Sequence, residues 1–225
     1  MSRDKLGACG VAGFVLAATL LRATNVDITA ILPFEHNSVG PASLLPDEVL
    51  VSRAEDVIRA RECTATGGGP APPPPVLLTV ATLTGHVIRA YGWYGASIAN
   101  GPARKAGYDQ VIADAGSSWG DPFECSIMRR DDFNLIASRT DREDVCQTND
   151  KESVNTSRGH MFPAAFLIRA TGLDRHGMAA PPAERIPFVH MDVAGSAEDG
   201  VEPGLGLCGI TGSPVCTLAG AFLDL

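Results

Sequence analysis

Residues 76–85 read Val-Leu-Leu-Thr-Val-Ala-Thr-Leu-Thr-Gly, and this stretch decides the fold class. Val76–Ala81 is a continuous apolar run of the length typical of a buried strand, and Thr82–Gly85 follows it as a turn. The segment Ile186–Val193 predicts another strand much later in the chain. Strands separated by helical stretches favour an α/β fold with a mixed, largely parallel central sheet flanked by helices.

Periodicity and turn residues around these two strands indicate the remaining elements. Val26–Phe34 is rich in Val, Ile and Leu and predicts a further strand. The polar segments Glu35–Asp47 and Asp131–Ser157 are expected to form loops. Helices are expected over Leu6–Arg22, Pro102–Ala115, Pro163–Thr171 and Pro214–Leu223.

The composition fits one globular domain, with 225 residues of which 45% are apolar and 20% are charged. The net charge of −8 argues against nucleic acid as a partner, because phosphate binding needs clustered Lys and Arg. The six cysteines include no CxxC pair, so the spacing of zinc ribbons and zinc fingers is absent. Scattered cysteines of this kind are typical of reduced thiols in an intracellular protein.

The run Leu6–Leu21 carries no charge and has two interpretations. It resembles a secretory signal or a membrane anchor in outline, but Asp4 interrupts the basic start. The run is also shorter than the roughly 20 residues that span a bilayer. Its many Gly and Ala residues suit a helix packed closely against a sheet, so we expect a buried helix and no membrane partner.

Residues Thr64–Pro75 differ in kind from the rest, with the sequence Thr-Ala-Thr-Gly-Gly-Gly-Pro-Ala-Pro-Pro-Pro-Pro. Proline lacks the backbone N–H that a regular element needs, and glycine adds flexibility. We expect a solvent-exposed, partly polyproline-like linker. A proline-rich ligand for another protein is the alternative.

Three local patterns carry little functional information. Gly116–Gly120 fits G-x-S-x-G, but a helix is expected before its serine, which reverses the strand-to-helix order of a nucleophile elbow. The five histidines show no close metal-ligand spacing, and His190 is expected to be a core histidine, or one that supports a ligand. Arg129–Asp132 is interpreted as a solvated charged face.

Three other stretches are more informative in series than alone. Val80–Gly85 joins a strand to a loop, His190–Gly195 ends a strand with His-Met-Asp-Val-Ala-Gly, and Gly209–Val215 is a turn before the last helix. Gly120–Pro122 and Ser157–Phe166 match in the same order and spacing. Together they resemble the C-terminal part of the leucyl (cytosol) aminopeptidase catalytic domain, and the resemblance covers most of residues 1–225.

The resemblance implies a peptidase that removes N-terminal, preferably hydrophobic, residues from peptide substrates with two divalent metal ions, Zn or Mn. Two neighbouring cations polarise the scissile carbonyl and generate hydroxide near neutral pH. Hard anionic oxygen ligands neutralise the charge of the two ions. The resemblance further implies a cytoplasmic protein that assembles as a homohexamer.

The resemblance also implies metal ligands. Met1–Asp4 matches the family pattern Met-x-x-Asp, which makes Asp4 a ligand and places Met1 in the pocket for the substrate side chain. Glu55 matches a second carboxylate ligand, in the family motif Asn-Thr-Asp-Ala-Glu-Gly-Arg. Substrate contacts are implied at five further positions, the peptide-holding Thr82, Leu83 and Gly85 and the pocket-lining Ala194 and Ala197.

The motif around Glu55 departs from the family. Arg53 stands where the family has an aspartate ligand, and Val57 stands where it has an arginine that stabilises the transition state, for which Arg59 is a weak substitute. A positive charge beside a dication opposes metal binding. The family's lysine and aspartate ligands and catalytic lysine precede the position of Met1. We therefore expect an impaired or inactive chain.

Three functions fit these observations. The first is a metalloaminopeptidase of impaired activity, and the second is a non-catalytic relative that acts as a structural or regulatory subunit. The third is an unrelated secreted or membrane-anchored α/β protein. Metal content distinguishes the first two, and the fate of residues 1–22 distinguishes the third.

Overall fold

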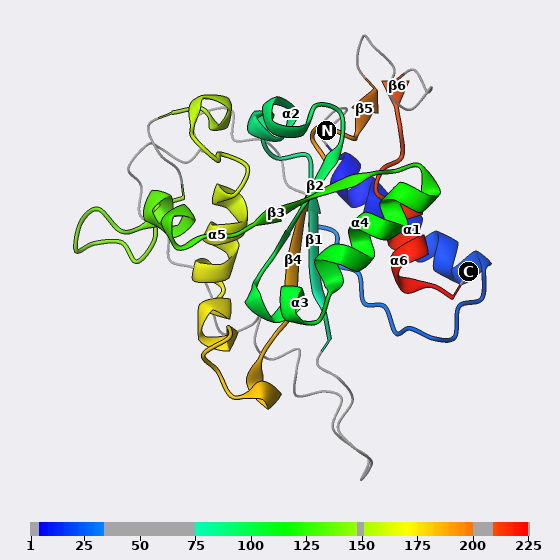
Figure 1. The fold of residues 1–225 in the computed structure, drawn as a ribbon, viewed down its shortest axis with the longest axis horizontal. Coiled ribbons are helices and arrows are strands. Elements are labelled where there is room, and N and C mark those ends of the chain that lie inside the picture. The colour runs from blue at the N-terminus through cyan, green and yellow to red at the C-terminus, as the bar shows by residue number, and fades with distance from the viewer. Residues whose placement is uncertain (1–4, 34–74, 148–150, 200–208, 225) are drawn as a thin grey trace.

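The computed structural model describes residues 5–33, 75–147, 151–199 and 209–224 (Figure 1). Its α-helices are α1 Leu6–Leu20, α2 Gly85–Tyr91, α3 Gly101–Lys105, α4 Tyr108–Trp119, α5 Phe162–Ala170 and α6 Val215–Phe222. Its strands are β1 Leu77–Ala81, β2 Gly95–Ala99, β3 Phe123–Ile127, β4 Phe188–Asp192, β5 Glu198–Asp199 and β6 Gly209–Ile210. Short 3-10 turns include η2 Arg130–Ile136, η3 Ser153–Asn155, η4 Leu173–His176 and η5 Pro182–Glu184.

The central sheet has four strands in the order β1-β4-β2-β3. The pairs β1–β4 and β2–β3 are parallel, whereas β4 and β2 are antiparallel. A small antiparallel pair, β5–β6, stands apart from this sheet. The expected α/β fold with a mixed, mostly parallel sheet is therefore confirmed.

Helices cover both faces of the sheet (Figure 1). Helices α1, α4 and α6 lie together on one face, where Phe14, Ile112 and Leu218 pack with Val189 and Met191 of β4. Helix α5 lies on the opposite face, where its residues join two smaller apolar clusters. Because successive residues of a strand point to opposite faces, β4 supplies Val189 and Met191 to the layer of α1, α4 and α6, and Phe188 and His190 to the layer of α5.

Helix α1 packs closely because glycine lies at its contacts. A methyl group added at Gly7 would clash with the backbone of Val80 in β1, and one added at Gly10 would lie 2.6 Å from Pro214. This close approach supports the interpretation of Leu6–Leu21 as a packed helix. Within the described residues, no helix combines the length and the apolar character needed to cross a bilayer.

Two expected elements differ in the structure. Val26–Phe34 was expected to be a strand, but as far as Pro33 the segment forms neither a strand nor a helix. A strand needs a hydrogen-bonded neighbour, whereas the side chain of Asn25 donates to the carbonyl of Phe222 at 3.0 Å and ties this part of the chain to the end of α6. The single helix expected over Pro102–Ala115 is divided into α3 and α4 at Gly107, whose φ is +82°.

The other described predictions are confirmed in outline, whereas helix α2 and strands β2, β3, β5 and β6 were not predicted. The strands β1 and β4 and the helices α1, α5 and α6 lie where they were expected. The expected loop at Asp131–Ser157 contains the turns η2 and η3. Strands β2 and β3 carry Gly, Ala, Ser and Glu, so they lack the apolar run that reveals a strand. Glu35–Asp47 and residues 64–74 of the expected linker lie outside the described residues.

We predict that Gly7→Val separates α1 from the sheet. The added side chain meets backbone atoms that cannot move aside, so the free energy of unfolding should fall by about 1–3 kcal/mol. Urea unfolding measures the change. Ala12→Val, on the exposed side of α1, is the control and should leave the midpoint nearly unchanged. Equal midpoints for the two variants would contradict this account of the packing.

Candidate functional site

The candidate site lies at the carboxyl ends of the parallel strands β1 and β4. Strand β1 ends at Ala81 and β4 ends at Asp192, and these two residues are partners in the register. The chain therefore leaves the sheet at two adjacent points, through the loop Thr82–Gly85 and through the loop that begins at Val193. Ligands of open α/β sheets bind preferentially outside such carboxyl ends.

The buried carboxylate of Asp192 joins these two loops. Its Oδ1 accepts hydrogen bonds from the backbone N–H of Leu83 at 3.2 Å and of Ala194 at 3.1 Å. Its Oδ2 accepts from the Thr84 hydroxyl at 2.5 Å, and Thr84 in turn caps α2 by accepting from the N–H of Val87. Burial raises the pKa of Asp192, although each of these hydrogen bonds favours the ionised form.

The structure brings four of the five implied substrate positions to this edge. Leu83 is 50% exposed, Gly85 is exposed, and Thr82 and Ala194 are half-buried. Ala197 lies in the same loop as Ala194, but its side chain is buried and its backbone pairs with Val193 and Thr211. Thr82, Leu83, Gly85 and Ala194 are thus accessible at one edge, whereas Ala197 supports the loop from beneath.

The implied metal ligands cannot be placed in the same way. Met1, Asp4, Glu55 and the weak candidate Arg59 all lie outside the described residues. Among the residues that are described, no three His, Cys, Asp or Glu side chains gather in a way that would hold a metal ion.

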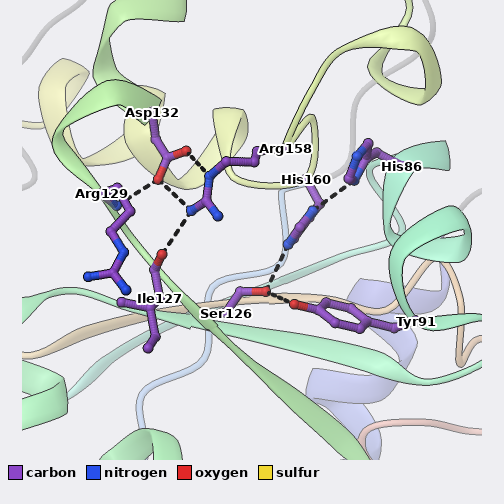
Figure 2. Close-up of polar contacts among 8 residues, drawn as sticks. All are labelled: His86, Tyr91, Ser126, Ile127, Arg129, Asp132, Arg158 and His160. Carbon is purple, nitrogen blue, oxygen red and sulfur yellow. Dashed lines mark hydrogen bonds and ion pairs between the residues drawn. The ribbon is translucent and has the colours of Figure 1, made fainter.

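A chain of four polar side chains lies beside this edge and was not predicted (Figure 2). The Tyr91 hydroxyl and the Ser126 hydroxyl are 2.7 Å apart, and Ser126 Oγ is 2.8 Å from His160 Nε2. The other ring nitrogen of His160, Nδ1, is 2.8 Å from Nδ1 of His86. The four residues come from α2, β3 and the turn before α5, so their spacing along the sequence gave no signal of the contact.

The position of His160 depends on the two residues before it. Arg158 has a φ of +57°, an uncommon conformation for a residue with a side chain. Its guanidinium binds both carboxylate oxygens of Asp132, at 2.7 and 2.9 Å, and the carbonyl of Ile127. At Gly159 there is no room for a Cβ against the backbone of Ser153. These constraints turn His160 toward the sheet (Figure 2).

The same ion pair corrects the interpretation of Arg129–Asp132 as a solvated face. Asp132 is only 2% exposed, and it also accepts from the N–H of Arg129 at 2.7 Å. A buried carboxylate is stable only when it is paired and hydrogen-bonded, and Arg158 supplies that pairing from a distant part of the sequence. Arg129 and Asp131 remain exposed, so only part of the run is solvated.

The two histidines of this hydrogen-bonded chain of side chains, His160 and His86, are held in the neutral form. Burial, the neighbouring His86 and the charge of Arg158 lower the pKa of His160 to about 4. Burial, Arg89 and Arg158 lower the pKa of His86. A neutral imidazole offers one donor and one acceptor, so each ring must pair one protonated nitrogen and one unprotonated nitrogen with its neighbours.

His190 is a core histidine, as expected from the sequence. It lies in one row across the sheet with Thr79, Ile98 and Ser126, on the face that α5 covers. Its Nδ1 is 2.9 Å from the Thr79 hydroxyl, and its buried Nε2 has no hydrogen-bond partner among the described residues. Burial lowers its pKa to about 4, with a smaller effect from His160.

The G-x-S-x-G pattern does not form a nucleophile elbow. Ser118 is exposed within the last part of α4, and β3 follows it rather than precedes it. The following Asp121 is buried and accepts from the N–H of Thr217, which fixes the start of α6. This stretch of the chain therefore has a structural role.

Comparison with known proteins identifies the family of this protein. The family model for the cytosol aminopeptidase catalytic domain matches residues 69–219. A putative aminopeptidase of Caenorhabditis elegans is 34% identical over 88% of this chain. A probable cytosol aminopeptidase of Bacillus subtilis is 25% identical over 97% of this chain. The chain spans 40% and 41% of the lengths of these two relatives.

Solved structures include one of the bottromycin maturation enzyme BotP in complex with Mn. It is 22% identical, covers 68% of this chain and 30% of that chain, and has a TM-score of 0.45. The match to the family model decides the classification. The chain belongs to the cytosol aminopeptidase family, whose members are leucyl aminopeptidase-type metallopeptidases.

We predict that Asp192→Ala destabilises the protein far more than Asp192→Asn. Alanine leaves the N–H groups of Leu83 and Ala194 without an acceptor, which should lower the free energy of unfolding by about 1–3 kcal/mol. Asparagine keeps one oxygen for these donors and presents an amide to the Thr84 hydroxyl, so its loss should be smaller. Urea unfolding of both variants measures the difference, and equal losses would contradict the proposed role of the carboxylate.

A second prediction concerns pH. Because the pKa values of His160 and His190 fall to about 4, the unfolded state binds more protons than the folded state between about pH 6.5 and pH 4. The free energy of unfolding should therefore fall as the pH drops through this window. The slope is at most about 1.4 kcal/mol per pH unit for each group.

Urea unfolding at several pH values across this window measures that slope. His160→Gln and His190→Gln each remove one of the two groups, so each variant should show a shallower dependence on pH. Slopes identical to that of the parent protein would show that neither histidine is held neutral by burial.

Proposed function

We propose that this chain is the substrate-binding part of a metalloaminopeptidase that removes N-terminal residues from peptides. The observation that supports this most directly is the carboxylate of Asp192, which holds Leu83 and Ala194 together at one edge of the sheet. In the family pattern these loops bind the backbone and the side chain of the substrate. A peptide would lie across Thr82–Gly85, with its first side chain directed toward Ala194.

The proposed preference for a hydrophobic N-terminal residue rests on the size and character of this edge. Ala194 is small and half-buried, and Gly195 beside it fits so closely that an added methyl would lie 2.6 Å from the carbonyls of Gly92 and Tyr94. Ala194 and Gly195 carry no charge, so the loop would present only a small apolar side chain to a bound residue. Met1 would contribute to the same pocket by resemblance.

We propose that the family's two divalent ions, Zn or Mn, bind this chain only weakly. Asp4 and Glu55 are the carboxylates that match the family, whereas Arg53 and Val57 replace an acidic ligand and the functional arginine. Arg53 would place a positive charge beside the dication, which opposes its binding. When bound, such ions polarise the scissile carbonyl and activate water. The chain is accordingly proposed to have impaired activity or none.

A non-catalytic role is the second candidate. On this proposal the domain, residues 1–225 with the linker 64–75, acts as a structural or regulatory subunit in a cytoplasmic homohexamer or beside active relatives. The departures at Arg53 and Val57 favour it, because they affect the metal motif and leave the edge at Asp192 intact. Native mass measurement of the purified protein tests the assembly.

The direct test is hydrolysis of leucyl-p-nitroanilide by the purified protein with added Mn, with metal content measured on the same sample. We expect no turnover above the buffer rate and little bound metal. Turnover that a chelator and Asp4→Ala both abolish would overturn the inactive interpretation. Turnover unaffected by the chelator would contradict the proposed metalloaminopeptidase.

A gain-of-function prediction tests the metal motif itself. Arg53→Asp replaces a repelling charge with a ligand, so Mn affinity should rise by at least about tenfold. Arg53→Asp combined with Val57→Arg should then give measurable hydrolysis. Arg61→Asp makes the same change of charge outside the motif and serves as the control. Equal Mn affinities for Arg53→Asp and Arg61→Asp would show that the register assigned to Glu55 is wrong.

A further inference from the structure

The hydrogen-bonded chain Tyr91–Ser126–His160–His86 runs from the half-buried Tyr91 through buried Ser126 and His160 to His86, the residue after Gly85 (Figure 2). Ser126 and His160 are buried at 6% and 5% exposure, whereas His86 is half-buried. His86 uses Nδ1 to contact His160, so its Nε2, on the other side of the ring, is left for contacts outside the chain. That nitrogen belongs to the residue directly after Gly85.

The chain has two internally satisfied arrangements of its protons. In the first, Tyr91 donates to Ser126, Ser126 donates to His160 Nε2, and His160 Nδ1–H donates to His86 Nδ1. His86 then carries a proton on Nε2 and is an outward donor. In the second arrangement every one of these bonds is reversed, so His86 Nε2 carries a lone pair and accepts. Both arrangements use neutral imidazoles, and both leave each internal nitrogen and oxygen paired.

Conversion between the two arrangements conserves protons. One proton leaves His86 Nε2, one passes along each of the three hydrogen bonds, and one enters at the Tyr91 hydroxyl from solvent. When these transfers occur together, neither imidazole holds a second proton. The positive charge of Arg158 lies near both rings, and it therefore disfavours the imidazolium form that the alternative route would require.

The position of His86 indicates what it contacts. Gly85 donates its N–H to the Ser153 hydroxyl at 3.2 Å, and Val154 lies beside its α-carbon. The turn η3 and helix α2 thus form a wall beside Gly85. A peptide whose first side chain is directed toward Ala194 would extend its next residue along this wall, where main-chain groups alternate between N–H donors and C=O acceptors.

We propose that His86 Nε2 contacts the main chain of the second residue of a bound peptide, and that the Tyr91–Ser126–His160 chain lets it donate or accept as that residue requires. This inference rests on the proposed function, because it takes the peptide to lie across Thr82–Gly85. If these four side chains served only to hold the turn before α5 against the sheet, they would not all need to be groups that can both donate and accept a hydrogen bond. An apolar contact would tie the turn before α5 to the sheet without burying polar atoms.

A metal ion is a less suitable occupant of the histidine pair. The ring planes are 15° apart and the two Nδ1 atoms only 2.8 Å apart, less than the about 4 Å that two Zn–N bonds between facing nitrogens would need. Arg158 and Arg89 add positive charge nearby. A hydrogen bond between the two Nδ1 atoms satisfies this geometry, and a dication between them would not.

The test uses the full chain labelled with ¹⁵N at histidine and at backbone amides, titrated with leucyl-leucine and, separately, with leucine. Leucine has no second residue and is the matched control ligand. We expect both ligands to shift the Gly85 amide and only leucyl-leucine to shift the His86 Nε2 signal. His86→Ala should weaken leucyl-leucine binding by about two- to tenfold and leave leucine binding unchanged.

Three outcomes would overturn the inference in different ways. A shift of Gly85 without a shift of His86 would refute the contact while leaving the proposed function intact. If neither ligand shifts Gly85 or His86, the proposed function fails together with the contact. The third outcome is that Tyr91→Phe, like the control Tyr108→Phe, leaves the His86 nitrogen signals unchanged. The Tyr91–Ser126–His160 chain would then not decide whether His86 donates or accepts, and its role would be structural.

Discussion

The carboxylate of Asp192 is the constraint on which the functional edge depends. It lies at the end of β4, is fully buried, and accepts from two loops that would otherwise be independent. A carboxylate in this position can bind several N–H and O–H donors at once, which no apolar side chain can do. Burial of this carboxylate is unfavourable and raises its pKa. Its hydrogen bonds in turn fix the geometry of Leu83, Thr84 and Ala194.

The two faces of the sheet differ in character: one carries the larger apolar core, and the other carries the buried polar side chains. On the face of α1, α4 and α6, strand β4 contributes Val189 and Met191 to the larger apolar core. On the face of α5 it contributes His190 and Asp192, and β3 adds Ser126. Neutral histidines suit this second layer, because an imidazole both donates and accepts without bringing a full charge into the interior.

The sequence predicted the edge better than it predicted the network beside it. Thr82, Leu83 and Gly85 follow an apolar strand and Ala194 follows the predicted strand over Ile186–Val193, so both the strands and the loops after them were visible. The contact of His86 with His160 joins residues 74 positions apart, and the contact of Ser126 with His160 joins residues 34 apart. No periodicity carries that information, and the isolated histidines gave no ligand spacing. The metal positions Asp4 and Glu55 remain predictions from resemblance.

The sequence by itself determined the α/β class and the places of β1, β4, α1, α5 and α6, because their apolar and glycine-bearing patterns have only a few ways to bury their surface. It also determined the family, through short motifs in a fixed order. Only the tertiary structure decided that Val26–Pro33 forms no strand, that Asp132 is buried by Arg158, and that the polar chain ends beside Gly85. Each of these depends on a partner distant in the sequence, and hydrogen bonds between such partners exist only once the chain has folded.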